Sequence, residues 1–202
     1  MTDAYRTVAE PATADFVVQG SEFLGHVRPV DSVDAAESFI ETVEAEYADA
    51  THNVPAYRVR ADPEGELLRE YSSDDGEPSG SAGKPALNVL EKQELENCAV
   101  VVTRYYGGTN LGVGGLVRAY SKAVKDAVDA AGVVEERPHE SVSVTVEYDD
   151  SGTVRGILES EGYEFEADYD ADVSFDVRVP IAEAEPFRDR LRSATSGRVD
   201  LD

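Results

Sequence analysis

The sequence predicts an α+β protein built as two α/β sandwiches. Segments whose apolar residues alternate, which is typical of strands, are interspersed with segments whose apolar residues recur every three or four positions, which is typical of helices. A charged segment, Glu135-Glu136-Arg137-Pro138, separates two groups of such segments. After it the order is strand, helix, strand, strand, helix, strand, as in the ferredoxin-like fold. We therefore expect one domain over residues 1–137 and another over residues 138–202.

The first half of the first domain is predicted from these periodicities. The stretch Phe16–Val27 resembles one strand. Asp31 or Ser32 can cap a helix, because a short polar side chain there accepts a hydrogen bond from the first turn. The apolar positions of that helix are Val33, Ala36, Phe39, Ile40, Val43 and Tyr47. Residues 54–60 alternate like a strand, and residues 66–71 are its expected partner across a turn at residues 62–65.

The second half of the first domain begins with a polar loop at residues 72–83. Pro85 suits the first turn of a helix that we expect to run to about Glu96. The β-branched run from Cys98 to Tyr106 predicts a buried strand, and the pattern from Leu116 to Ala131 predicts a helix.

The second domain is predicted in the same way. Residues 142–148, 163–167 and 173–179 alternate like strands. Ser151 can cap a helix that Gly162 ends, since glycine readily adopts the left-handed conformation after a helix. Phe187, Leu191 and Ala194 mark a last helix, and a short strand follows at residues 198–201.

The composition is strongly acidic. There are 42 Asp and Glu residues against 18 Lys and Arg, which gives a formal net charge of −24. The acid is spread along the chain rather than collected in a tail, which resembles the surface of proteins from salt-accumulating halophiles. The N-terminus lacks the apolar stretch of a secretory signal, no segment is apolar enough to cross a membrane, and Cys98 is the single cysteine. These features predict a cytoplasmic protein.

We expect folding to require salt. Self-repulsion of a net charge of −24 destabilises the compact state when it is poorly screened. The melting temperature should therefore rise steeply between about 0.1 and 2 M KCl, as the Debye length falls from about 10 Å to below about 3 Å. Thermal melts followed by circular dichroism measure this, and a melting temperature that stays constant across the series would contradict it.

The segment from Cys98 to Lys125 carries most of the functional information. It contains no Asp or Glu, although the whole chain is acidic. A strand ending in Arg104-Tyr105-Tyr106 leads into five glycines, Gly107, Gly108, Gly112, Gly114 and Gly115, and then into a helix. Glycines before a helix let a ligand approach the backbone N–H groups, which makes an anion site. The alternative is a tight turn that only packs the helix onto a sheet.

Common nucleotide motifs do not match this segment. A Walker A loop requires Lys after its last glycine, whereas Gly112 is followed by Val113. The dinucleotide fingerprint requires a third glycine where this chain has Val117. On the following helix, Arg118, Lys122 and Lys125 share one face, opposite the apolar stripe. We therefore predict an anion or nucleic-acid site made by Arg104, Tyr105, Tyr106, Gly107, Gly108, Asn110, Gly112, Gly114, Gly115, Arg118, Lys122 and Lys125, the alternative for the cations being an ordinary solvated face.

Charge alone would bind RNA weakly at high salt. Four phosphate contacts lose roughly 10³- to 10⁴-fold in affinity between 0.1 and 1 M salt. Stacking by Tyr105, Tyr106 or Tyr57 would have to contribute, at about 1–3 kcal/mol per base. For at least one of these tyrosines, burial in the core is the alternative.

The polar loop supplies secondary candidates. Asp74, Asp75 and Glu77 could hold Mg²⁺, but their spacing is not that of a calcium loop, and solvated turn carboxylates are the alternative. His52 could act as a general base or be structural, and Lys84 follows the loop. We predict no metal site, no cofactor and no catalytic residue.

Two glycine-rich blocks resemble the IMPACT/YigZ family of uncharacterised and translation-linked proteins, in its two-domain prokaryotic form. They are residues 101–120 and residues 75–85, where the family usually has Thr at Ser81; Ser21–Leu24, Thr51–Asn53 and Ala56-Tyr57 also fit. The resemblance implies a first domain like domain 2 of ribosomal protein S5 and a second like the ferredoxin-like domains of elongation factor G. Eukaryotic members bind a kinase activator using an added N-terminal domain. About 15 residues precede the predicted first strand here, so that partner is not implied.

Three hypotheses of function follow. The first is a protein that binds RNA or the ribosome and modulates translation or a stress response, and more plausibly not an enzyme. The second is an enzyme or sensor for a small phosphorylated ligand held at the glycines, with Asp75 and Glu77 assisting through Mg²⁺. The third is a protein-binding module without a ligand.

Overall fold

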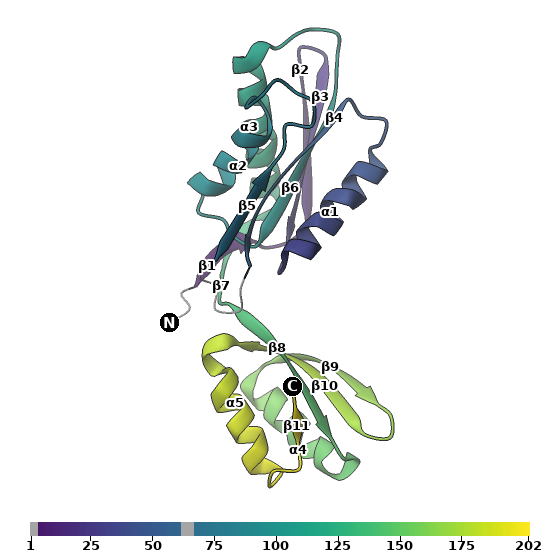
Figure 1. Ribbon diagram of the computed structural model, residues 1–202, viewed down its shortest axis with the longest axis vertical. Coiled ribbons are helices and arrows are strands. Elements are labelled where there is room, and N and C mark those ends of the chain that lie inside the picture. Colours follow the sequence, from purple (N-terminus) through teal and green to yellow (C-terminus); the bar gives the residue numbers. More distant parts are fainter. Residues whose placement is uncertain (1–3, 62–66) are drawn as a thin grey trace. The chain divides into compact units, whose positions relative to one another are not determined.

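The computed structural model describes residues 4–61 and 67–202. It divides into two compact units, Ala4–Glu136 and Arg137–Asp202, each with its own sheet and core (Figure 1). The expected turn at residues 62–65 lies outside the described residues.

The first unit is built on a five-stranded antiparallel sheet. Its strand order is β2-β3-β6-β4-β5, with β2 Ala12–Val18, β3 Ser21–Pro29, β4 His52–Arg60, β5 Leu68–Ser72 and β6 Cys98–Tyr105. The central strand β6 is buried on both faces, which explains why its first five residues, Cys98–Val102, form a continuous apolar run rather than an alternating one. A separate ribbon pairs β1 (Tyr5–Val8) with β7 (Val133–Glu136).

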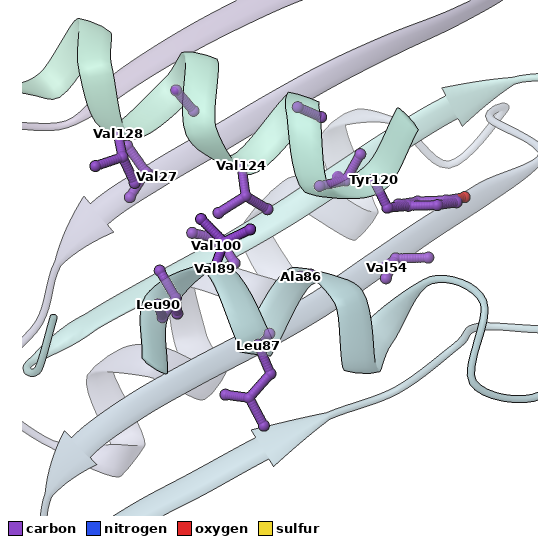
Figure 2. Close-up of a cluster of buried hydrophobic side chains, with 14 of the residues drawn as sticks. Val27, Val54, Ala86, Leu87, Val89, Leu90, Val100, Tyr120, Val124 and Val128 are labelled. Carbon is purple, nitrogen blue, oxygen red and sulfur yellow. The ribbon is translucent and has the colours of Figure 1, made fainter. Parts of the chain in front are cut away.

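Three helices cover the two faces of this sheet. Helix α1 (Val33–Glu46) packs on one face against Val101 and Tyr57. Helices α2 (Gly83–Lys92) and α3 (Gly112–Ala131) pack on the other (Figure 1). There Leu90, Val124 and Val100 meet in the larger core, and Figure 2 shows Ala86 of α2 and Tyr120 of α3 toward the same end of the sheet. Among the described residues, no helix is long and apolar enough to cross a membrane.

The N-terminal part differs from the sequence prediction. Residues 16–27 form no single strand, because Gln19 and Gly20 adopt φ values of 48° and 81°. Two such residues make the two-residue turn typical of tight hairpins, so β2 and β3 fold back on each other. The prediction of about 15 residues before the first strand is likewise wrong, since β1 begins at Tyr5. Neither β1 nor β7 has enough apolar alternation to be predicted alone.

Two helix ends also differ. Helix α2 ends at Lys92 rather than near Glu96, because Glu94 adopts a left-handed φ of 56°. Helix α3 begins at Gly112 rather than Leu116, so Gly112, Gly114 and Gly115 belong to its first turn. Ser32 caps α1 as expected, with its hydroxyl accepting from Ala35 N–H at 3.1 Å.

The second unit has the predicted ferredoxin-like order. Strands β8 (His139–Val146), β9 (Glu164–Tyr169), β10 (Val173–Pro180) and β11 (Asp200–Leu201) form an antiparallel sheet in the order β11-β8-β10-β9. Helices α4 (Tyr148–Glu161) and α5 (Ile181–Ala194) contribute Leu158 and Leu191 to its core. Gly162 ends α4 with φ 76°, as predicted. The helix begins at Tyr148, however, which is three residues before the expected cap Ser151.

Because each unit has its own buried core, we propose that residues 137–202 fold when expressed alone. The amide NMR spectrum of this fragment in high salt should overlay the corresponding signals of the full chain. A fragment spectrum typical of an unfolded chain, while the full chain remains folded, would show that the second unit depends on the first.

Candidate functional site

A buried polar cluster lies where β6 ends. Glu77 is only 8% exposed, and its Oε1 accepts hydrogen bonds from Arg104 Nη1 at 2.5 Å and from Tyr120 OH at 2.8 Å. Burial, with the hydrogen bond to Glu77, raises the pKa of Tyr120 well above its usual range. Glu77 is thus an internal anchor and not the solvated turn carboxylate that the loop composition suggested.

Arg104 lies in this cluster rather than on the surface. It is 5% exposed and forms a buried ion pair with Glu77, and its Nη2 donates to Ser21 Oγ at 3.4 Å. Its guanidinium lies 5.4 Å from the ring centroids of both Phe23 and Tyr106. The charge of Arg104 is therefore balanced by Glu77 inside the protein, and its guanidinium also contacts the ring of Tyr106.

The polar loop is held by its own carboxylates. Asp74 accepts from the backbone N–H groups of Gly80, Ala82 and Gly83 at 2.7–3.1 Å, which caps α2. Burial raises the pKa of the Asp74 carboxyl, but the three N–H donors outweigh burial, so the net pKa is lowered. Asp75 accepts from Asn53 N–H at 2.6 Å. In the described part of the chain, no three His, Cys, Asp or Glu side chains are arranged to hold a metal ion.

His52 is held by this loop as well. Its Nδ1 donates to the Asp75 carbonyl at 2.6 Å, and its Nε2 lies 3.8 Å from Glu77 Oε2. Both ring nitrogens thus face groups of the loop, which makes His52 part of the polar cluster.

The glycine segment, residues 107–115, is packed against the protein at Gly107, whereas Gly108 and Gly112 face open space. Gly107 N–H donates to Ser21 Oγ at 3.1 Å, and a Cβ on Gly107 would lie 1.9 Å from the Gly20 carbonyl carbon. Gly108 and Gly112 have left-handed φ values of 86° and 69°, and a Cβ on either would meet nothing within 4 Å. Close packing therefore requires Gly107, and also Gly115, where a Cβ would lie 2.9 Å from Leu111 Cβ.

The N-terminus of α3 is uncapped, in contrast to that of α2. Its N-cap residue Leu111 makes no side-chain hydrogen bond, and its first turn contains no acidic residue. A Cβ on Gly114 would lie 3.5 Å from Arg118 Nη1, so the guanidinium of this exposed residue lies close to the first turn. A cation beside the positive end of a helix dipole is unfavourable without an anion. The Arg118 guanidinium and the N-terminus of α3 therefore both favour the binding of an anion between them.

The cationic face of α3 is partly neutralised by residues outside the acid-free segment. Lys122 is ion-paired with Asp126 and also lies 4.7 Å from the centroid of the Phe16 ring. Arg118, Lys125 and Lys84 are exposed and form no ion pair within residues 4–61 and 67–202. Folding also brings Asp49 to Tyr105, whose hydroxyl donates to it at 2.9 Å.

Of the three candidate tyrosines, Tyr106 is the exposed one. The residue is 46% exposed, and its hydroxyl donates to Asn110 Oδ1 at 3.2 Å. Tyr57 is 3% exposed and stacks on Tyr71 with the ring centroids 5.3 Å apart, so it belongs to the core. Tyr106 is thus the candidate tyrosine most accessible to solvent, and the neighbouring Tyr105 is half-buried.

Sequence reasoning missed the roles of Ser21, Asp74 and Tyr120. Asp74 precedes a helix by nine residues, so no spacing rule for caps could find it. Tyr120 lies on the predicted apolar stripe of α3, and a tyrosine on such a stripe indicates a buried hydroxyl that needs a partner. Its partner, Glu77, could not be named without the fold.

Comparison with known proteins places this geometry in a family. The Impact N-terminal domain model matches residues 19–128, and the domain of unknown function DUF1949 matches residues 144–198. The chain is 35% identical to "IMPACT family member YvyE" of Bacillus subtilis (strain 168), over 100% of this chain and 91% of the relative. The chain belongs to the IMPACT family.

Other relatives align with nearly the whole of this chain. The chain is 34% identical to "IMPACT family member YigZ" of Escherichia coli (strain K12), over 96% of this chain and 94% of the relative. A solved structure described as "Crystal structure of an hypothetical protein" superposes with a TM-score of 0.68 and 32% identity, covering 100% of this chain and 97% of the other. The resemblance first identified in the two glycine-rich blocks thus extends over the whole IMPACT-family chain.

Proposed function

We propose that this IMPACT-family protein binds RNA, free or on the ribosome, in the cytoplasm and so modulates translation. The binding surface would comprise Tyr106, Asn110, the open glycines 108, 112 and 114, and the helix-face cations Arg118, Lys122 and Lys125. The observation that carries the proposal is Arg118 next to the uncapped N-terminus of α3. The exposed Tyr106 is linked to the same segment, because its hydroxyl donates to Asn110, two residues before the helix. Backbone N–H groups and the guanidinium would contact phosphate, and the ring would stack on a base.

The second candidate is a small phosphorylated ligand at the same surface. The uncapped first turn of α3 favours it, because one phosphate group can accept hydrogen bonds from several backbone N–H groups. Asp75 and Glu77 do not support a Mg²⁺-assisted form of this hypothesis, since both already accept hydrogen bonds inside the protein.

We expect the double variant Arg118→Glu plus Lys122→Glu to lose at least about tenfold in affinity for single-stranded RNA, since phosphate contacts become repulsive. Fluorescence anisotropy with a labelled RNA dodecamer measures this, and co-sedimentation with ribosomes extends it. The matched control is Lys92→Glu plus Arg69→Glu, which makes the same change of charge at exposed positions of the same unit. Equal losses in both variants would show that net charge, and not this surface, governs binding.

Salt dependence separates the two candidates. For an interface with several phosphates, the logarithm of the binding constant falls by several units for each tenfold rise in salt concentration. For a single bound phosphate group it falls by about 1 unit. The titration is done with the RNA dodecamer and, separately, with inorganic phosphate. Binding of neither probe, with the fold intact, would leave the glycine segment as a structural turn.

A further inference from the structure

The outer edge of strand β2 is open in the first unit. Strand β2 is the first in the order β2-β3-β6-β4-β5 and pairs only with β3. The hairpin turn sets the hydrogen-bonding pattern, so Val18 pairs with Ser21 and Phe16 with Phe23 by backbone hydrogen bonds. The N–H and C=O groups of Thr13, Asp15 and Val17 therefore point away from β3, and the described residues place no backbone partner on them.

Apart from the charge of Asp15, this edge lacks the features that normally protect an edge strand. Across its seven residues β2 pairs with β3 in unbroken register, with no bulge, and contains neither proline nor a cation. Natural proteins usually place lysine, proline or a bulge on a free edge to prevent pairing with other chains. Thr13, Asp15 and Val17 are all exposed, and the Val17 side chain reaches 67% exposure. The edge is thus available to an added strand.

A groove of about 310 Å³ opens beside this edge, between the β2–β3 hairpin and α1. Its walls include Pro11, Thr13, His26, Phe39, Thr42 and Glu46. His26 is fixed in place, with Nδ1 3.2 Å from Thr13 Oγ1 and Nε2 3.3 Å from Thr103 Oγ1. Burial lowers the pKa of His26 despite the nearby Glu46 carboxylate, which favours the neutral imidazole. The groove has room for one side chain of an added strand.

The acidic residues around the β2 edge favour a basic partner strand. Asp15 on β2, Glu22 on β3 and Glu46 on α1 lie on the α1 side of the hairpin, where the groove's cation is Arg28. A second copy of this chain, paired antiparallel over all seven residues, would put Asp15 opposite Asp15, which is destabilising. Each copy also carries a net charge of −24. A partner strand with cations at alternate positions is complementary instead.

We propose that β2 is a docking edge for an extended, basic segment of a partner protein, which adds as a sixth strand and places one side chain in the groove beside α1. Backbone pairing with Thr13, Asp15 and Val17 would supply affinity, and Asp15, Glu22 and Glu46 would select Lys or Arg, as in other strand-addition complexes. This site uses the outer edge of β2 and its α1 side, whereas Lys122 of the α3 surface proposed for RNA contacts Phe16 of β2.

The probe for this proposal is a fluorescein-labelled peptide of four Lys-Val repeats, titrated with the full chain in about 1 M KCl, where general charge attraction is screened. Its control is a peptide of two Lys-Lys-Val-Val repeats, which has the same composition and charge without the alternation. We expect the alternating peptide to bind at least about tenfold tighter, and to slow amide hydrogen exchange at Thr13, Asp15 and Val17.

Two changes test the backbone pairing. Val17→Pro removes an outward N–H without touching the β2–β3 hydrogen bonds and should weaken binding about tenfold, whereas Val17→Thr should leave it within about twofold. Methylating alternate amides of the peptide should abolish binding by unaltered protein, which excludes misfolding as the cause. Equal affinity for the two peptides would overturn the proposal, as would a chain that is already a dimer and is dissociated by Val17→Pro.

Discussion

Replacing Glu77 by alanine is expected to destabilise the first unit by about 3–5 kcal/mol, because Arg104 would be left as a buried, unpaired cation. The hydroxyl of Tyr120 would also lose its acceptor. This is a large part of the roughly 5–15 kcal/mol that stabilises an ordinary domain. Urea unfolding at fixed high salt, followed by circular dichroism, measures the change in the free energy of unfolding.

The ion pair itself need not be the source of stability. The double variant Glu77→Leu plus Arg104→Met removes both charges and should be markedly more stable than Glu77→Ala, since apolar replacements of buried pairs are often neutral. Glu77→Gln keeps an acceptor oxygen but loses the charge and should fall between the two. A cost below about 1 kcal/mol for Glu77→Ala would mean that water reaches Arg104 and that the cluster is not a dry interior.

Gly107→Ala is expected to cost about 3 kcal/mol or more, because its Cβ would lie 1.9 Å from the Gly20 carbonyl carbon and 2.3 Å from Ser21 N. Both contacts are backbone atoms of the β2–β3 turn, so no side-chain rotation can relieve the overlap. The loss should appear in the same unfolding measurement.

Gly114→Ala is the matched comparison within the same glycine segment. Its Cβ would meet only Arg118 Nη1, at 3.5 Å, so stability should be unchanged or rise by up to about 1 kcal/mol, since alanine favours a helix over glycine. If a phosphate approaches the first turn of α3 closely, the same variant should bind RNA more weakly while remaining folded. Similar stability losses in Gly107→Ala and Gly114→Ala would contradict the structural distinction between these glycines.

Much of the architecture could be predicted from the sequence because it depends on local periodicity and capping. The ferredoxin-like order after residue 137, the cap at Ser32 and the helix end at Gly162 all depend on residues close together in the chain. The β2–β3 hairpin was missed because Gln19 is an unusual residue at a left-handed turn position, and the run on both sides of it is strand-like. The start of α3 was missed because glycines are poor helix formers.

The features of the candidate site likewise fall into those that the sequence determines and those that the tertiary structure determines. The sequence by itself determined which segment is free of carboxylates, where the glycines fall, and that Arg118, Lys122 and Lys125 share a helix face. Only the tertiary structure decided that Arg104 is balanced by Glu77 and that Tyr57 is in the core, whereas Tyr106 and Arg118 remain exposed. The pair of Lys122 with Asp126 is local, since the two residues lie four apart on one helix. The physical reason is that helical periodicity is a property of neighbouring residues, whereas burial and charge pairing depend on groups such as Glu77 and Arg104, which are distant in sequence and meet only once the sheet has formed.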